Sequence, residues 1–504
     1  MKTYKYLKPV ILGLMMFSSC NEDILEKDNP NQLSTGTFFT NEAELSAGVT
    51  AIYSGLQANN LYNREYFFLW DMLSDENVGT ANLEPPRAAA LNYNFDAGNK
   101  LVNDVWQGLY RVIHRANLVI DVADDIPEEE LSVAARNRYV AQARFLRAWA
   151  YNDLVSLWGP VPLHTEPATP ATLAEGFPRV PVEQIYQLIF EDLDFAEANL
   201  PTKSEWGASE LGRVPKGAAQ ALKGKIHMFR GDYAAARTEF QKVISSGQYS
   251  LVPEFEDNFT EENENNAESI FEVQFSTAHG YGVPWNDGGD GQGIAEVTFR
   301  GQEYTPITGW NNVNPSPGLL SAYEEGDPRF DYTFYEDGEE YCFGCPEKAD
   351  GTPYTMELSQ VGWKKYSNAY KQGNENQISG INFRVIRYAD VLLMMAEAVN
   401  ELEGPAAAIE YVNQVRQRPS VDLPELAAPA SKEEMFEIIA RERRVELASE
   451  QVRTRDLIRW RKNGKLTSEP IANYNPSKHA LLPIPAQELA NNQALTNEDQ
   501  NPNY

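Results

Sequence analysis

Residues Ala135 to Leu163 read ARNRYVAQARFLRAWAYNDLVSLWGPVPL, and this stretch decides the fold. Its apolar residues recur at intervals of three or four, which places one apolar stripe along a helix of about seven turns. Small alanines between the large residues let a second helix approach closely. Gly159 and Pro160 end the helix, because proline cannot continue the backbone hydrogen-bonding ladder. A helix this long needs helical partners, which would cover the stripe of Tyr139, Ala143, Leu146, Ala150, Leu154 and Leu157.

Other stretches repeat this design as pairs of helices. Segment 215–246 has two alanine-rich helical patterns around a Gly231-Asp232 break, and segment 388–416 has two around Gly404-Pro405. Such pairs, with a period near about 34 residues, are typical of tetratricopeptide-type repeats. The sequence therefore predicts a mainly α fold in which tetratricopeptide-like helix pairs form a scaffold. Further helices are expected at 42–56, 105–122, 181–200 and 431–449.

The charge of the chain limits its partners. The 504 residues include 43 basic and 73 acidic side chains, a formal net charge of −30. Nucleic acids and anionic membrane surfaces are therefore poor partners for the body of the protein. The same charge favours a neutral ligand over a polyanionic one.

The N-terminus has the pattern of a lipoprotein signal. Three lysines precede the short apolar run Val10 to Phe17, and Ser18-Ser19 places small residues before Cys20. The run is too short to span a bilayer. We therefore expect residues 1–19 to be a signal peptide and Cys20 to be lipidated, anchoring the chain. The polar residues 20–33 suit a tether.

Residues 251–380 interrupt the helical rhythm. A short strand is expected at 268–275, and the glycine-rich segment 276–317 is longer than ordinary loops. Its aromatic residues are untypical of disorder. The segment is therefore interpreted as a ligand-facing, loop-rich insertion carrying short strands. Cys342 and Cys345 lie nearby, and a local disulfide is favoured over free thiols or a metal pair in an exported protein.

Motifs along the chain together resemble the SusD/RagB family of outer-membrane lipoproteins of Bacteroidetes. Each is weak alone, but they follow one another in a single order. Two positions depart from the family pattern: Gln451 stands where glycine is usual, and Pro419 where alanine is common. Both lie in scaffold segments and bear only on local helix ends. The matching residues are Trp106, Tyr110 and Asn117, the run 143–148 with Gly159 and 161–163, Gly212-Arg213-Val214, Asp327-Pro328-Arg329, 387–393 with 396–398, Glu442-Arg443 with Glu446-Leu447, 482–485 and 500–502.

The resemblance implies a SusD-like fold, with residues 34–504 forming a single domain behind the signal peptide and tether. It also implies a protein of the cell surface, attached to the outer membrane by its lipid. Such a protein captures oligosaccharides or polysaccharide and delivers them to a SusC-type TonB-dependent transporter. The acidic charge of the protein favours a neutral ligand, such as a β-glucan.

Glycan binding would use two kinds of side chain. Aromatic faces cover the apolar C–H face of a sugar, while carboxylates, amides and guanidinium groups hydrogen-bond its hydroxyls. The tryptophans at 106, 149 and 158 lie in helical motifs and are expected in the core. For each candidate the alternative is structural: an aromatic closing a loop over the core, a solvated loop acid, or, for the arginine, a salt bridge at a helix start. Loops at about 60–95 and 276–370 are expected to form a shallow carbohydrate site. The candidate ligand-binding residues are Trp70, Asp71, Asp75, Trp285, Tyr304, Trp310 and Arg384.

An enzyme and a pure protein-interaction scaffold are the competing classes. The chain has no nucleophile elbow, no H-E-x-x-H and no phosphate loop, and its five histidines have no ligand spacing. Among so many acidic residues a pair of carboxylates is always available. The presence of such a pair therefore does not distinguish a glycosidase from a protein without catalytic activity. Segment 286–291 resembles a calcium loop, but Gly288 occupies a ligand position and no closing glutamate follows. We therefore expect no catalytic residues, metal or cofactor.

Overall fold

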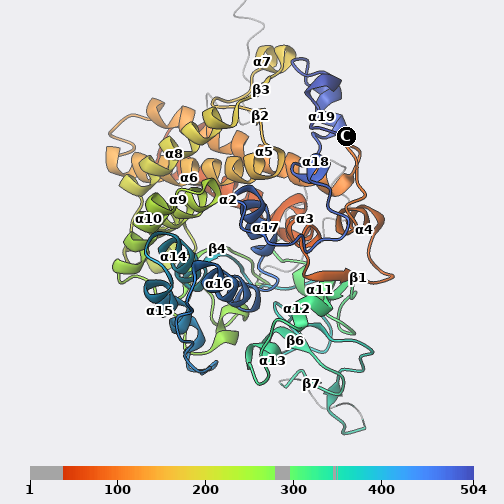
Figure 1. Cartoon of the computed structure of the whole chain (residues 1–504). Helices are drawn as coiled ribbons and strands as arrows, with labels where there is room; N and C mark the ends of the chain where they lie inside the picture. The colour runs from red at the N-terminus through yellow and green to blue at the C-terminus, as the bar shows by residue number, and fades with distance from the viewer. Residues whose placement is uncertain (1–37, 279–295, 344, 346–347, 349) are drawn as a thin grey trace, which may run out of the picture.

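The helical frame is built on α6 (Val133–Trp158), in a computed structural model that describes residues 38–278, 296–343, 345, 348 and 350–504. Ser132 caps the first turn by accepting a hydrogen bond from the Ala135 backbone N–H, and Gly159 ends the helix at a φ of 72°. The central helix is therefore confirmed. Three helices surround it (Figure 1): α5 (Lys100–Val122) and α8 (Val182–Asn199) pack along α6, and α2 (Glu42–Leu56) packs on α5.

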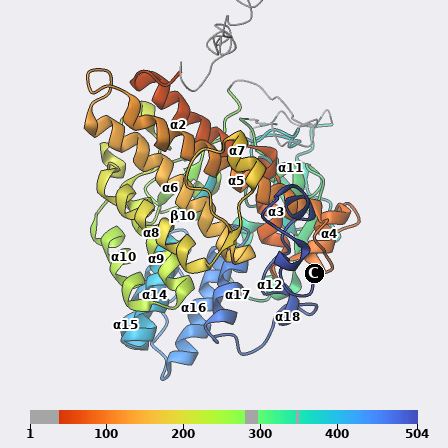
Figure 2. The same cartoon turned by 90° about the horizontal axis from the view of Figure 1, so that it is seen from above.

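The predicted helix pairs continue the frame. The Gly231-Asp232 break joins α9 to α10, and Gly404 joins α14 to α15, with φ of 78° and 97° at the two glycines. Each helix packs on the next, and Figure 2 shows the series along one side of the molecule. The mainly α, tetratricopeptide-like fold is confirmed. The helices are α9 (Lys216–Arg230), α10 (Tyr233–Ser245), α14 (Tyr388–Leu402), α15 (Pro405–Arg416) and α16 (Lys432–Glu446).

Strands in the described part of the chain are short and form five antiparallel pairs. The predicted strand at 268–275 is confirmed as β4 (Ser269–Val273), which pairs with β10 (Phe383–Arg387) directly before α14. A second pair joins β1 (Asn77–Gly79) to β5 (Val313–Pro315). The other pairs are β2 (Val161–Pro162) with β3 (Arg179–Val180), β6 (Phe334–Tyr335) with β9 (Gly362–Trp363), and β7 (Glu340–Tyr341) with β8 (Tyr354–Thr355).

The loop-rich region lies at one end of the frame, at the lower right of Figure 1. A disulfide joins Cys342 to Cys345 between β7 and β8. No helix in the part of the chain that the structure describes is long and apolar enough to cross a membrane. The remaining helices are α3 (Glu65–Met72), α4 (Pro85–Leu91), α7 (Pro170–Glu175), α11 (Arg300–Tyr304), α12 (Pro317–Leu320), α13 (Arg329–Thr333), α17 (Arg453–Lys462), α18 (Pro476–His479) and α19 (Ala486–Asn491).

A buried ion network ties this region to the frame. Glu446 on α16 accepts hydrogen bonds from Arg329, Arg387 and Arg418, and all four side chains are at most 1% exposed. Glu268, next to β4, accepts from both Arg387 and Arg418. Burial alone would raise the pKa of Glu446, but the guanidinium groups of Arg418 and Arg387 outweigh it and hold the pKa well below its ordinary value. The family motifs around these arginines and glutamates therefore meet in the interior.

The segment expected to form ligand loops at about 60–95 is instead mostly regular structure. It contains a π-helical turn (Asn59–Asn63), α3, β1 and α4. Every residue of α3 is buried, so its sequence EYFFLWDM has no polar face to reveal a helical period. From its sequence alone, this buried helix therefore cannot be distinguished from an irregular aromatic segment.

Candidate glycan-binding surface

The turn that carries Trp310 is held by main-chain hydrogen bonds to α11. The Trp310 N–H donates to the Gln302 carbonyl at 2.6 Å, and the Asn312 N–H donates to the Glu303 carbonyl at 2.9 Å. The Trp310 indole is half-buried. It lies nearly parallel to the Phe299 ring, with centroids 6.5 Å apart, and the Arg64 guanidinium carbon lies 5.9 Å from its centroid. The indole is therefore partly exposed at the surface, with Phe299 and Arg64 beside it.

Glu303 stabilises this turn from inside the protein. Its fully buried carboxylate accepts hydrogen bonds from the Arg64 Nε and from the Asn312 Nδ2. Burial raises the pKa of Glu303, and the nearby Arg64 opposes that rise. One carboxylate therefore connects the start of α3 to the residue that follows the Trp310 turn.

The segment after β1 supports the turn from its other side. Asn82 donates from Nδ2 to the Trp310 carbonyl at 2.8 Å, and the Thr80 hydroxyl donates to the Asn311 carbonyl at 2.6 Å. The Thr80 N–H also donates to the Asn312 carbonyl at 3.0 Å. Antiparallel pairing of β1 with β5 brings these distant segments together. The turn that carries the indole is therefore held by an amide and a hydroxyl side chain, and indole, amide and hydroxyl groups are those that a sugar ring and its hydroxyls require.

Four of the predicted ligand contacts are buried instead. Trp70 is 1% exposed, and the Arg455 guanidinium carbon covers it 3.6 Å from the ring centroid. Asp71 and Tyr304 are each 1% exposed and hydrogen-bond each other at 3.0 Å. Arg384, 2% exposed, pairs with Glu272 across the β4–β10 ladder. The expectation that these four residues line a surface is corrected, because α3 and β10 pack on helices of the frame and α11 packs on α3.

Asp75 lies at the edge of the interior. Its side chain is 11% exposed and is bound by Arg453 at 2.7 Å and by Arg444 at 2.9 Å. Burial would raise the pKa of Asp75, but the hydrogen bond and charge of Arg453 outweigh it and lower the pKa. Asp75 is therefore an ionised carboxylate held by two arginines.

Several further predictions lie outside the described residues: Trp285, Cys20, the signal and tether segments and the calcium-like segment 286–291.

Sequence reasoning missed Thr80, Asn82 and Arg64. The only available signal was the turn-forming composition of TANLEPP at 80–86, which gives no indication that Asn82 has its partner 228 residues along the chain. Long-range pairing of this kind has no local sequence pattern. Among the described residues no cluster of histidine, cysteine, aspartate or glutamate could hold a metal ion.

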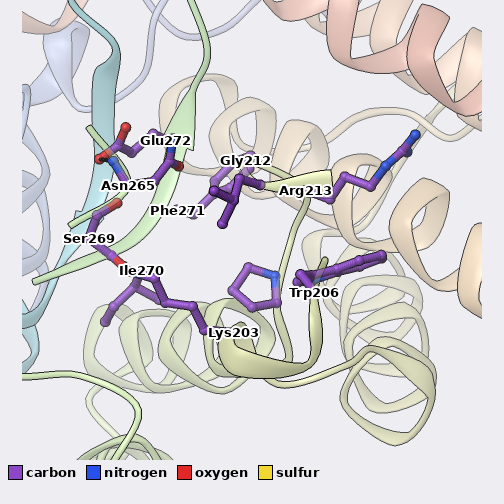
Figure 3. A pocket seen from close by; sticks show the side chains of 11 residues that line it. Lys203, Trp206, Gly212, Arg213, Asn265, Ser269, Ile270, Phe271 and Glu272 are labelled. Carbon is purple, nitrogen blue, oxygen red and sulfur yellow. Dashed lines mark hydrogen bonds between the residues drawn. The ribbon is translucent and has the colours of Figure 1, made fainter. Parts of the chain in front are cut away.

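A small cavity on the frame is not a ligand site. It lies between Lys203, Trp206, Arg213 and the start of β4, as Figure 3 shows. Its volume is about 20 Å³, which is room for about one water molecule and not for a sugar ring.

The helical scaffold with a loop-rich end, carrying a half-buried indole beside amide and hydroxyl groups, defines a SusD-like carbohydrate-binding protein. Two family models match the chain over most of its length: one described as the SusD family over residues 267–504, and one described as starch-binding associating with outer membrane over residues 23–228. The chain belongs to the SusD/RagB family.

Relatives match nearly the whole chain. SusD-like protein P25 of Formosa agariphila is 27% identical, with 98% of each chain covered. A solved laminarin-binding SusD-like protein is 28% identical, with a TM-score of 0.75 over 92% of this chain and 100% of that one. A SusD superfamily protein from Bacteroides vulgatus is 26% identical, with a TM-score of 0.75 over 91% of this chain and 99% of that one.

Proposed function

We propose that this chain is a non-catalytic surface lipoprotein that captures a neutral glycan on the Trp310 turn and passes it to a SusC-type transporter. Lipid on Cys20 would hold it to the outer membrane, and residues 34–504 would act as one domain. The helix pairs would provide a rigid frame for the transporter contact. The observation that carries the proposal is the half-buried indole of Trp310, fixed beside the Asn82 amide in a SusD-family fold.

A β-glucan is the ligand that we propose. The laminarin-binding relative supports this choice, as does the net charge of −30, which disfavours uronic or sulfated chains. A glucan also presents flat C–H faces that an indole can cover.

Calorimetric titration of the mature chain tests the proposal with laminarin, a neutral β-glucan, and alginate, an acidic polymer. We expect heat with laminarin and none with alginate. Covering an aromatic side chain yields about 1.5–3 kcal/mol, and the partly buried indole has at most about a third of that left to gain, so Trp310→Ala should weaken binding about two- to fivefold.

Phe343→Ala is the matched control, because Phe343 is an aromatic of the same loop-rich region that is 78% exposed. It should leave laminarin binding unchanged. Unaltered binding by Trp310→Ala would contradict the proposed site. Shorter products after incubation would indicate an enzyme, and no heat with any neutral glycan would favour a scaffold role.

A further inference from the structure

A groove opens beside the Trp310 turn, between α4, β1 and residues 470–473. Its volume is about 470 Å³, within the usual range for small-molecule sites and far larger than the cavity of Figure 3. Figure 1 shows α4 and β1 next to each other at the edge of the loop-rich end. The groove is therefore large enough for sugar rings.

The walls of the groove differ in chemistry. Leu83, Ala88 and Leu91 form an apolar wall from α4 and the turn before it. Gly79 allows this wall to pack closely on β1, since a Cβ there would lie 2.9 Å from Leu83 and 3.2 Å from Leu91. The lining also contains the hydroxyls and amides of Ser74, Thr80, Asn92 and Asn473. Apolar side chains together with hydroxyl and amide groups match the C–H faces and the hydroxyls of a pyranose ring.

The charge of the groove favours a neutral ligand. Asp75 is the single charged side chain among the described residues that line it. Arg453 and Arg444 bind that carboxylate and compensate its charge, and neither arginine lines the groove. The described lining therefore offers a uronic acid or sulfate group no lysine or arginine, whereas a neutral sugar needs none.

The groove is continuous with the Trp310 turn. Thr80 lines the groove, and its hydroxyl donates to the Asn311 carbonyl at 2.6 Å. The same hydroxyl accepts a hydrogen bond from the Asn82 N–H at 3.1 Å, and Asn82 in turn binds the Trp310 carbonyl. One short segment, 79–83, thus forms a rim of the groove and a support of the turn.

We propose that this groove is a second glycan subsite, which binds further residues of the neutral chain whose first contact is Trp310. The inference rests on the proposed function and adds that the binding affinity depends on the length of the glycan. Short oligosaccharides would occupy the Trp310 turn alone, whereas longer ones would reach the groove and bind more tightly. Leu91 and Ala88 would cover the C–H faces, and Asn92 and Asn473 would hydrogen-bond the hydroxyls.

Calorimetric titration with laminari-oligosaccharides of two to six residues tests the inference. For the natural chain we expect affinity to rise at least tenfold from the shortest to the longest probe. Ala88→Phe, which fills the groove from α4, should abolish this rise and leave the affinity for the shortest probe unchanged. Ala174→Phe is the matched control, since it adds the same side chain at an exposed position of α7, which Figure 1 shows at the top of the molecule, away from α4 and β1.

A second variant keeps the test decisive if Ala88→Phe does not fold. Asn473→Ala removes one exposed amide without filling space, and should reduce affinity for the longest probe several-fold while leaving the shortest unaffected. If both variants keep the full rise with length, the groove is not a subsite, and the proposed function stands. If Trp310→Ala binds every probe as the natural chain does, or no probe binds at all, the proposed site itself has failed.

Discussion

Replacing Glu446 with glutamine would remove one negative charge from the centre of the buried ion network. The Glu446 Oε1 accepts from Arg387 at 3.0 Å and from Arg418 at 2.8 Å, and its Oε2 accepts from Arg329 at 3.1 Å. Glutamine has the same shape, but it is neutral and would turn an N–H donor towards an arginine. Removing one partner of a buried ion pair costs about 3–5 kcal/mol, because the remaining charge loses its compensation. With three guanidinium groups affected, we expect the upper part of that range.

Thermal unfolding measures this loss. At about 2.1 cal/mol/K per residue, a chain of 504 residues unfolds with an entropy of about 1 kcal/mol/K, so the melting temperature should fall by about 4–5 °C. Glu403→Gln is the matched control, because Glu403 pairs with Arg237 where both side chains are nearly half exposed, and such pairs contribute less than about 1 kcal/mol. If Glu446→Gln melts no lower than Glu403→Gln in scanning calorimetry, the reasoning that this network stabilises the fold is wrong.

Two further predictions concern stability. Burial raises the pKa of Glu375 to about 7, so its bound proton stabilises the fold fully below pH 4.5, and this contribution is lost as the pH rises to about 7. Glu375→Gln should therefore raise the melting temperature above that of the natural chain at pH 8 but not at pH 4, and an equal effect at both would contradict the cause. Gly224→Ala would place a Cβ 2.4 Å from the Phe240 ring where α9 packs on α10, and should lose about 1–3 kcal/mol in chemical denaturation. Gly207→Ala, with no atom within 4 Å of its Cβ, should lose far less.

The frame could be predicted because its signals are local. The glycine breaks at Gly231 and Gly404 both have positive φ, and every residue of the stripe predicted along α6 is buried. The helix expected at 431–449 begins as α16 behind a Ser431 cap, with the Glu434 N–H donating to the Ser431 hydroxyl at 3.1 Å. Periodicity and caps act within a few residues, so one sequence is enough to find them.

The candidate site could not be predicted to the same extent, because exposure is a property of the tertiary structure. Trp70 and Trp310 both stand in aromatic segments that look like loops, yet one lies in a helix enclosed by the frame and the other in a surface turn. Asp71 looked like a hydroxyl acceptor, but it binds Tyr304 and Gln451 in the interior. Local patterns identify the chemical groups that a side chain carries. They do not show whether the tertiary structure exposes that side chain or buries it.

The departure from the family pattern at Gln451 has a structural meaning. Its φ is 59°, in the left-handed region that favours glycine. The Gln451 side chain compensates by donating to Asp71 at 2.8 Å and to the Ser449 carbonyl at 3.2 Å. The residue therefore preserves the turn after α16 and adds a link to α3. This departure concerns packing and leaves the ligand surface untouched.

The residues that identify the family and those that we propose to contact sugar perform separate tasks. Arg329, Arg387 and Glu446 belong to the motifs and lie in the interior, whereas Trp310 and Asn82 belong to no motif and lie at the surface. Because main-chain carbonyls hold the Trp310 turn, its side chains can change without disturbing the ion network. Affinity and stability should therefore vary largely independently: Trp310→Ala would weaken glycan binding while lowering the melting temperature less than Glu446→Gln does, and Glu446→Gln would lower the melting temperature while the folded protein binds glycan as before.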